Sequence, residues 1–458
     1  MIQVHSTLAR SLVPLDTRDE GKVAMYVCGP TVQSEPHVGH GRSAVAFDVI
    51  RRYLTWRGYE VTFVRNITDV EDKIIAAAQE SGIPAEELAV TMAKRFADGF
   101  AGLGVLEPDV EPKATESVPQ IIEIIETLID RGLAYARNGD VYFSVRGYEG
   151  YGKLSGRKLD DLRSGHRIEV DESKDDPLDF ALWKAMKPGE PSWDSPWGPG
   201  RPGWHIECSA MAGSFLGNDV DIHGGGSDLI FPHHENEIAQ SEGATGETFV
   251  RYWLHNGMVN LGGKKMAKST GLIVDLASII ESAGGRALRM LFVRAHYRSP
   301  IEYSSDLLSE AAEALERLDR FRERATESFS SPSPGTADAV ALEQFSAVMD
   351  DDFNTPGAVS LLFDLVRDGN RILDEDGDVS GVADAVEVIV GVLGIDDATQ
   401  PTAADHVLSD EDIERLVSER EKARKERRFG DADAIRDTLV ETGVALEDGP
   451  HGTRWLRT

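Results

Sequence analysis

The sequence contains little cysteine and no long apolar run. Only 2 of its 458 residues are cysteines, Cys28 and Cys208, and they lie too far apart to indicate the disulfide framework of a secreted protein. No apolar run approaches the ~18 residues of a membrane span, and the first residues lack the charged-then-apolar order of a signal peptide. These absences predict a soluble, cytoplasmic protein that has no membrane partner.

Basic residues are scarce as well. The chain has 48 Lys and Arg against 79 Asp and Glu, which gives a formal net charge of −31. A field of that sign repels nucleic acid, so nucleic-acid binding would require a local basic surface. Residues 420–429 offer one, because six basic residues stand there against two acidic ones, beside Phe429. Such a segment suits single-stranded nucleic acid, and a helix face covered by salt bridges is the alternative.

What is present is an ordinary globular composition, 41% hydrophobic and 28% charged, with length for two to four domains of roughly 100–200 residues each. A β-rich run at 23–28, helical spacing over 39–56 and a second β-rich run at 61–64 begin a parallel α/β unit. An insertion of different texture interrupts this unit between 113 and 199. Helical periodicity follows from 304 onward, and a linker near 400–406 leads into a last unit of about fifty residues.

Two segments have the chemistry of a phosphate site. His37-Val38-Gly39-His40 follows the first strand and opens the next helix, where backbone N–H groups and the helix dipole favour an anion. Lys264-Lys265-Met266-Ala267-Lys268-Ser269 forms a basic loop, and its lysines can neutralise charge on a transferring phosphoryl group. Taken singly, two polar cap residues and a solvated turn remain the alternatives.

Two further groups indicate a metal and a nucleoside. His233 and Glu237 share a helix face and, with Cys28 and Cys208, would make a Cys₂-His-carboxylate zinc site; two inert core thiols are the alternative. The glycine run 224–226 follows a parallel-type strand, where backbone can approach a nucleotide, and Asp228 can accept bonds from ribose hydroxyls. A tight turn is the alternative there.

Together and in this order, these groups resemble the cysteinyl-tRNA synthetases. His37–His40 resembles the HIGH motif of class I enzymes, and Lys265–Ser269 resembles their KMSKS loop. More specific segments cover the whole chain: Tyr26-Val27-Cys28-Gly29-Pro30-Thr31, Asn66-Ile67-Thr68-Asp69, Trp204-His205-Ile206-Glu207-Cys208-Ser209-Ala210-Met211, His223-Gly224-Gly225-Gly226, Phe231-Pro232-His233-His234-Glu235-Asn236-Glu237, Asp351-Asp352-Phe353-Asn354-Thr355 and Leu446-Glu447-Asp448-Gly449-Pro450.

The resemblance implies an α/β Rossmann-type catalytic domain with a parallel sheet, an inserted connective subdomain, an all-α bundle and a small mixed C-terminal domain. The expected divisions are 1–112 and 200–303 for the two catalytic halves, 113–199 for the insertion, 304–400 for the bundle and 401–458 for the anticodon-binding domain. The implied activity is that of a cysteine–tRNA ligase. It uses ATP with Mg²⁺ to convert L-cysteine into cysteinyl-adenylate and transfers the cysteinyl group to tRNA(Cys), as a monomer.

The resemblance also implies roles for individual residues. One zinc ion per chain is expected on Cys28, Cys208, His233 and Glu237, where it binds the thiolate of the substrate. The expected catalytic residues are His37, His40, Lys265 and Lys268; the ATP-binding residues are Gly39, His40, Gly225, Asp228 and Lys268. The expected amino-acid pocket consists of Thr31, Thr68, Trp204 and His205. The expected anticodon contacts are Arg424, Phe429, Asp433 and Asp448.

Some positions depart from the family pattern, and two other functions compete. Gln33-Ser34 stands where Tyr-Asp is usual, Ala267 replaces a serine, and Thr270-Gly271-Leu272 replaces Leu-Gly-Asn. One rival is the related ligase that joins cysteine to a glucosaminyl-inositol amine in mycothiol synthesis; it lacks an anticodon domain, so the segment from Arg420 to Trp455 favours the synthetase. The other is a non-catalytic RNA-binding paralogue, which would not need both phosphate motifs.

Overall fold

The computed structural model describes residues 1–159, 174–261, 264–265, 274–328 and 337–396, and of the C-terminal part residues 417, 420, 435–436, 444–449 and 452–457. These residues belong to two compact units, Met1–Asp396 and Asp397–Thr458. In the second unit, β14 (Val444–Gly449) and β15 (Gly452–Arg457) form an antiparallel hairpin. Among the described residues, no helix combines the length and apolarity needed to cross a membrane.

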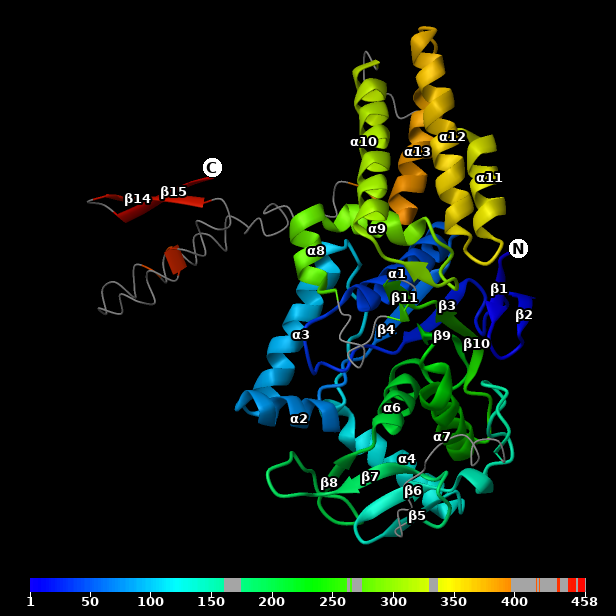
Figure 1. Cartoon of the computed structure of the whole chain (residues 1–458), viewed down its shortest axis with the longest axis vertical. Helices are drawn as coiled ribbons and strands as arrows, with labels where there is room; N and C mark the ends of the chain where they lie inside the picture. The colour runs from blue at the N-terminus through cyan, green and yellow to red at the C-terminus, as the bar shows by residue number, and fades with distance from the viewer. Residues whose placement is uncertain are drawn as a thin grey trace. The chain divides into compact units, whose positions relative to one another are not determined.

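A parallel sheet lies at the centre of the first unit (Figure 1). Its strands, in spatial order, are β10 (Val250–Asn256), β9 (Val220–Gly226), β3 (Lys22–Val27) and β4 (Glu60–Arg65). The chain runs from β3 to β4 on one side, and β9 pairs with the other side of β3. Parallel sheets bind ligands where the strand order reverses in this way, at the carboxyl ends of the strands. The ends of β3 and β9 therefore mark the expected position of a site.

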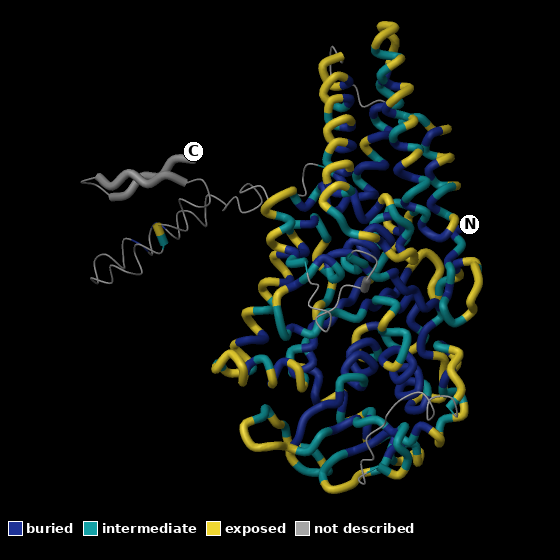
Figure 2. The backbone as a smooth tube through the Cα atoms, viewed as in Figure 1, coloured by how far each residue is buried: buried dark blue, intermediate teal, exposed yellow. Residues whose placement is uncertain are grey.

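Helices cover both faces of this sheet, and the side chains of β3 alternate between two cores. Met25 and Val27 pack with α1 (Val38–Trp56), whereas Tyr26 packs with α6 (Trp204–Leu216). Because β3 is buried on both faces, it is a nearly continuous apolar run rather than an alternating one. Figure 2 shows the buried residues concentrated along the sheet and the helix faces turned toward it.

A second sheet is formed by the part of the chain between β4 and β9. It is antiparallel, in the order β5 (Ala134–Arg137), β6 (Asp140–Phe143), β7 (Phe180–Ala185) and β8 (Gly200–Pro202). Before it come α2 (Asp72–Ser81), α3 (Ala85–Gly102), the short turn η1 (Thr115–Ser117) and α4 (Val118–Asp130); η2 (Val145–Gly147) follows β6. The chain returns to the parallel sheet through α6, η3 (Ile230–His234) and α7 (Glu235–Thr245).

Helices dominate the rest of the first unit. After β11 (Val259–Leu261) and β12 (Lys264–Lys265) come α8 (Leu276–Ala283), α9 (Gly285–Val293) and the short β13 (Ile301–Glu302). The following helices, α10 (Ser305–Ser328), α11 (Ala339–Met349), α12 (Thr355–Asp374) and α13 (Ser380–Leu393), pack side by side (Figure 1). A hairpin of β1 (Gln3–Ser6) and β2 (Ser11–Pro14) lies at the N-terminus. A parallel α/β sheet followed by helices confirms the predicted fold class.

Candidate active site and metal centre

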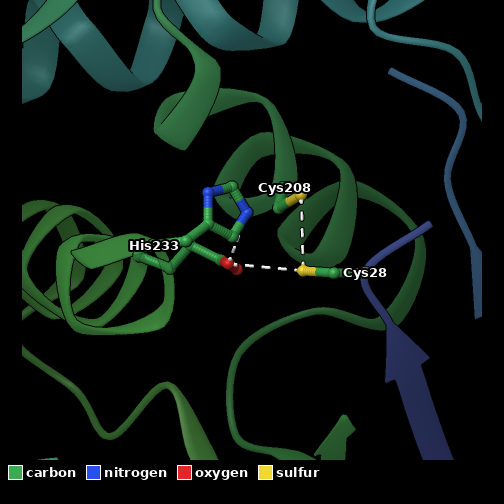
Figure 3. A group of neighbouring side chains, drawn as sticks. Cys28, Cys208 and His233 are labelled. Atoms are coloured by element: carbon green, nitrogen blue, oxygen red, sulfur yellow. Dashed lines mark hydrogen bonds and ion pairs between the residues drawn. The ribbon is translucent and has the colours of Figure 1, made fainter. Parts of the chain in front are cut away.

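Four side chains from separate elements meet at the carboxyl end of β3. Cys28 follows β3, Cys208 lies in α6, His233 in η3 and Glu237 in α7. The Sγ atoms of the two cysteines are 3.6 Å apart, and Cys28 Sγ lies 3.4 Å from Glu237 Oε1 (Figure 3). His233 Nε2 lies 3.1 Å from the same oxygen. Zinc bonds of about 2.0–2.3 Å give tetrahedral edges of about 3.3–3.8 Å. The two distances from Cys28 Sγ lie in that range, and all four ligand atoms lie within 4.8 Å of one another, close enough to hold one metal ion.

The cluster also contains buried acidic groups whose ionised forms a cation would stabilise. Burial raises the pKa of the Cys28 thiol and of the Glu237 carboxyl well above their ordinary values and lowers the pKa of His233. A hydrogen bond with Cys28 lowers the pKa of Cys208, but burial and the charges of Glu237 and Glu207 together outweigh it, so the pKa is raised. Glu237 Oε2 is buried and has no hydrogen-bond partner. A divalent ion would supply the charge that stabilises two thiolates and a carboxylate in this place.

A cavity of about 360 Å³ opens beside this cluster. Cys28 lines it, and so do six of the other residues predicted from the sequence: Thr31, His37, Gly39, His40, Trp204 and Asp228. We call Cys28, Cys208, His233 and Glu237 the metal cluster. The cavity therefore adjoins this cluster at Cys28, the N-terminus of α1 at His37, and the nucleoside candidate Asp228. Residues that lie more than 200 positions apart in the sequence meet here because β3 and β9 are neighbours in the sheet.

Of the described residues that were predicted for the amino-acid pocket and for ATP binding, three do not line the cavity. Thr68 is buried, and its hydroxyl donates a 3.0 Å hydrogen bond to Glu207 Oε2. His205 Nδ1 lies 2.9 Å from His233 Nδ1, so His205 contacts one of the four metal candidates directly. Gly225 has no room for a side chain, since an added Cβ would lie 3.0 Å from the His234 ring. These residues support the walls of the site.

The two histidines of the HIGH-like segment are held by hydrogen bonds at the start of α1. The N–H of Gly39 donates to His37 Nδ1 at 3.1 Å, and the N–H of His37 donates to His40 Nδ1 at 3.1 Å. The rings stack with centroids 3.7 Å apart. Because each Nδ1 accepts a bond, each ring carries its proton on Nε2. The two rings therefore lie together at the helix N-terminus, where the helix dipole favours an anion.

Several predicted residues lie outside the described part of the chain. Lys268, Arg424, Phe429 and Asp433 are among them. Lys265 lies in β12 and Asp448 in β14, where the structure describes only the strand. Their roles stay predictions.

The structure also brings to the cavity residues that the sequence reasoning missed. Lys73, near the start of α2, lines the cavity, and its Nζ lies 5.2 Å from the Trp204 ring. Asn256 lines it from the end of β10. The position of Asn256 after a buried strand was a usable signal, because strand ends form such sites. Nothing in the sequence around Lys73 distinguishes it from an exposed helix residue.

Family comparisons agree with this geometry along the whole chain. Residues 14–313 match the family of tRNA synthetases class I (C) catalytic domain, residues 344–395 the DALR domain, and residues 408–455 the cysteinyl-tRNA ligase anticodon binding domain. The chain is 49% identical over 464 residues to the cysteine–tRNA ligase of Alkalilimnicola ehrlichii, covering 100% of both. It is 45% identical over 470 residues to that of Brevibacillus brevis, covering 100% of this chain and 99% of the relative.

Solved structures share the fold at low identity. Methionyl-tRNA synthetase of Mycobacterium tuberculosis, in complex with methionyl-adenylate, superposes with a TM-score of 0.60 at 16% identity and covers 84% of this chain and 93% of its own. A leucyl-tRNA synthetase of Agrobacterium radiobacter in a ternary complex gives a TM-score of 0.60 at 11% identity, over 84% and 85% of the two chains.

The matches also decide between the competing functions. The mycothiol-type ligase lacks an anticodon domain, whereas residues 408–455 match one. A non-catalytic paralogue is disfavoured by near-full-length identity to enzymes. The chain therefore belongs to the cysteine–tRNA ligases, class I aminoacyl-tRNA synthetases that use ATP to attach cysteine to tRNA.

Proposed function

We propose that Cys28, Cys208, His233 and Glu237 bind one zinc ion and that this ion selects the substrate by its thiol. The proposal rests on one observation about Cys28: this residue belongs to the metal cluster and also lines the cavity. Zinc bound there would favour a soft thiolate over the hard, protonated hydroxyl of serine.

The remaining wall of the cavity would bind and orient the reactants. Trp204 packs against His233 with ring centroids 4.3 Å apart and bounds the amino-acid end. Gly226 and Asp228 lie at the carboxyl end of β9, where the nucleoside of ATP would bind. Because the His37 and His40 rings carry their protons on Nε2, they would donate to the phosphates from the start of α1.

The reaction divides into two steps. A carboxylate oxygen of cysteine attacks the α-phosphorus of ATP, which forms cysteinyl-adenylate and releases pyrophosphate. A terminal ribose hydroxyl of the tRNA then attacks the carbonyl carbon and AMP leaves. His37 and His40, with Lys265 and Lys268 on the β- and γ-phosphates, would stabilise the negative charge that grows in the first transition state. The chemistry is positioning and electrostatic stabilisation rather than covalent catalysis.

Recognition of the tRNA is assigned to the second unit, through Arg424, Phe429, Asp433 and Asp448. The proposed working form is one chain with one tRNA in the cytoplasm, which is the form that the family resemblance implies.

The test combines zinc content with two activities of the full chain. We expect about one zinc ion per chain, cysteine-dependent ATP–pyrophosphate exchange and cysteine charging of tRNA. Cys28→Ser should lose the zinc and at least 100-fold of the exchange, whereas Ser214→Ala on the exposed side of α6 should change neither. Wild-type exchange without bound zinc, or undiminished exchange by Cys28→Ser, would overturn the proposal.

A further inference from the structure

Behind the metal cluster lies a group of buried histidines for which the proposed mechanism has no use. His223 lies in β9, His234 in η3 and His255 in β10. His223 and His234 have no exposed surface, and His255 is 5% exposed. Buried imidazoles in an apolar core are costly unless their nitrogens are paired or bind a metal.

Two of these histidines lie within 4 Å of members of the cluster. His223 Nε2 is 3.4 Å from Cys28 Sγ and 3.4 Å from Glu237 Oε2. His234 Nε2 is 3.9 Å from Glu237 Oε1. The ligand atoms of Cys28, His223, His234 and Glu237 all lie within 4.8 Å of one another, as do those of the first cluster. The second group therefore passes the same test of spacing.

The hydrogen bonds around His234 are compatible with those of a metal ligand. Its Nδ1 lies 2.8 Å from His255 Nε2, and His255 Nδ1 lies 2.7 Å from the hydroxyl of Thr7. With a proton on each Nδ1, His234 donates to His255 and His255 donates to Thr7. This order leaves a lone pair on His234 Nε2, a buried atom that has no hydrogen-bond partner. Metal-bound histidines are oriented by such a bond at the opposite nitrogen.

The His223 ring is fixed by packing rather than by a hydrogen bond. It stacks on Trp253 with centroids 4.4 Å apart and an interplanar angle of 29°. This packing directs Nε2 toward Cys28 and Glu237, while Nδ1 is buried without a partner. Both rings are thus held in place before any ion binds.

We propose that Cys28, His223, His234 and Glu237 form a second position for a divalent metal ion, deeper than the first. The inference rests on the proposed zinc cluster, because the two positions share Cys28 and Glu237. One thiolate and one carboxylate neutralise a divalent ion there, and two neutral imidazoles complete four ligands suited to zinc or cobalt. Neither histidine lines the cavity, so an ion in the deep position is turned away from the substrate. It retains the metal but does not bind cysteine.

The experiment removes one ligand that only the first position uses. Cys208→Ala in the full-length protein should still bind one zinc ion, within about tenfold of the wild-type affinity, although cysteine-dependent exchange is lost. Adding His234→Gln to this variant should weaken zinc binding a further 100-fold or more, whereas His234→Gln alone should change it less than about threefold. Affinities come from competition with a chelator, and circular dichroism compares the folds of the variants.

X-ray absorption at the zinc edge gives a second readout that does not depend on activity. The zinc of Cys208→Ala should show one sulfur and two imidazoles, where the first position alone would leave one sulfur and one imidazole. The second position would be overturned if the zinc of Cys208→Ala showed the same number of imidazoles as the zinc of the wild type. It would also be overturned if His234→Gln weakened zinc binding equally in the wild type and in Cys208→Ala. If the wild-type chain binds no zinc, both proposals fail; if only Cys208→Ala loses its zinc, the first proposal stands and this one fails.

Discussion

Under the proposed function, single residues at this site have two tasks, one in the local structure and one in the chemistry. His37 shows this most clearly, because its Nδ1 caps α1 by accepting from the N–H of Gly39. Under the proposed function, the other nitrogen of the ring would donate to the phosphates. A variant can separate these tasks if it retains the cap and removes the donor.

His37→Asn is such a variant. Asparagine is among the preferred N-cap residues, so the melting temperature should change by no more than about 2 °C. The rate of cysteine-dependent ATP–pyrophosphate exchange should fall about 100-fold, the usual effect of removing one preorganised donor. Thr55→Ala, on an exposed residue at the far end of α1, is the matched control and should leave the exchange unchanged. Full exchange by His37→Asn would exclude the donor role.

At this scale the sequence indicated candidate residues that stand in motifs, and it missed residues that only the fold places at the site. All four metal candidates were predicted, and the structure brings them together. The amino-acid pocket was harder to predict, because Thr68 and His205 belong to the same motifs as the cavity residues but lie behind them. Lys73 carried no local signal. Its position depends on where α2 packs, which no short pattern encodes.

At the scale of elements, the close approach of β9 to α1 sets the geometry of the site. Gly224 lies against Phe47, and a Cβ added to the glycine would come 2.2 Å from the Phe47 ring. The carbonyl oxygen of Gly224 also accepts the N–H of Cys28 at 3.0 Å. The same glycine therefore sets the spacing between sheet and helix and supports the first metal ligand.

We expect Gly224→Ala to push β9 away from α1. The overpacked core should cost about 1–3 kcal/mol of stability, measured as a lower urea midpoint, and zinc affinity should fall with it. Gly213→Ala in α6 is the control, because its added Cβ meets no atom within 4 Å and alanine favours a helix by up to about 1 kcal/mol. Equal urea midpoints for the two variants would show that β9 can move away from α1 without a loss of stability.

A buried arginine connects α1, which packs on the parallel sheet, with the end of the last helix of the first unit, α13. Arg289 in α9 has no exposed surface and pairs with Asp48 of α1. It also donates to the backbone carbonyls of Leu103, Gly104 and Leu393. Burial raises the pKa of Asp48, but Arg289 and Arg52 outweigh it, and the pKa lies below its ordinary value. The carboxylate thus stays ionised in the fold.

Arg289→Met should destabilise the chain by about 3–5 kcal/mol, because it leaves a buried carboxylate and three carbonyls short of donors. Arg320→Met is the control, since Arg320 is 65% exposed and its nearest carboxylate is 3.9 Å away. The pKa of Asp48 is lower in the folded chain than in the unfolded chain, where it is about 3.9. The stability that Asp48 contributes is therefore fully present above about pH 3.9, and it is lost as the pH falls through the lower pKa of the folded chain. The difference in the free energy of unfolding between wild type and variant should therefore be constant from pH 6 to 8 and become smaller toward pH 3. A constant difference down to pH 3 would contradict this assignment.

At the scale of the whole molecule, the net charge of −31 opposes both compactness and tRNA binding. Salt screens charges over about 10 Å at 0.1 M and about 3 Å at 1 M. We expect the melting temperature to rise by several degrees between these KCl concentrations, while the KM for tRNA increases because salt weakens phosphate contacts. Sucrose, which is uncharged, should raise the melting temperature without raising that KM. A melting temperature that falls with KCl would mean that the acidic residues are balanced within the fold.

The order of elements was predictable at this scale, whereas their assembly was not. Strand, helix, strand in the first 65 residues indicated a parallel sheet, and the helical stripe from Leu307 onward indicated the following helices. The pairing of β9 with β3 joins residues about 200 positions apart. Only the family resemblance carried that information, because local periodicity contains nothing about which strands are neighbours.

The boundary between the two compact units permits a test of how the two half-reactions are divided. All the described core clusters and the cavity lie within Met1–Asp396. A chain ending at Asp396 should therefore keep cysteine-dependent exchange within about twofold of wild type. Charging of tRNA should lose at least about 100-fold in kcat/KM, because two lost base contacts at about 1–3 kcal/mol each suffice for that loss.

The control for this truncation is the full-length variant with Arg424 and Phe429 both replaced by alanine. It retains the mass and charge of the second unit almost unchanged, so a loss of charging there must come from those side chains. Parallel losses in both proteins, with exchange intact, assign tRNA recognition to residues 397–458. Loss of exchange in the truncated chain would mean that the second unit supports the active site itself, and the division of roles between the two units would be wrong.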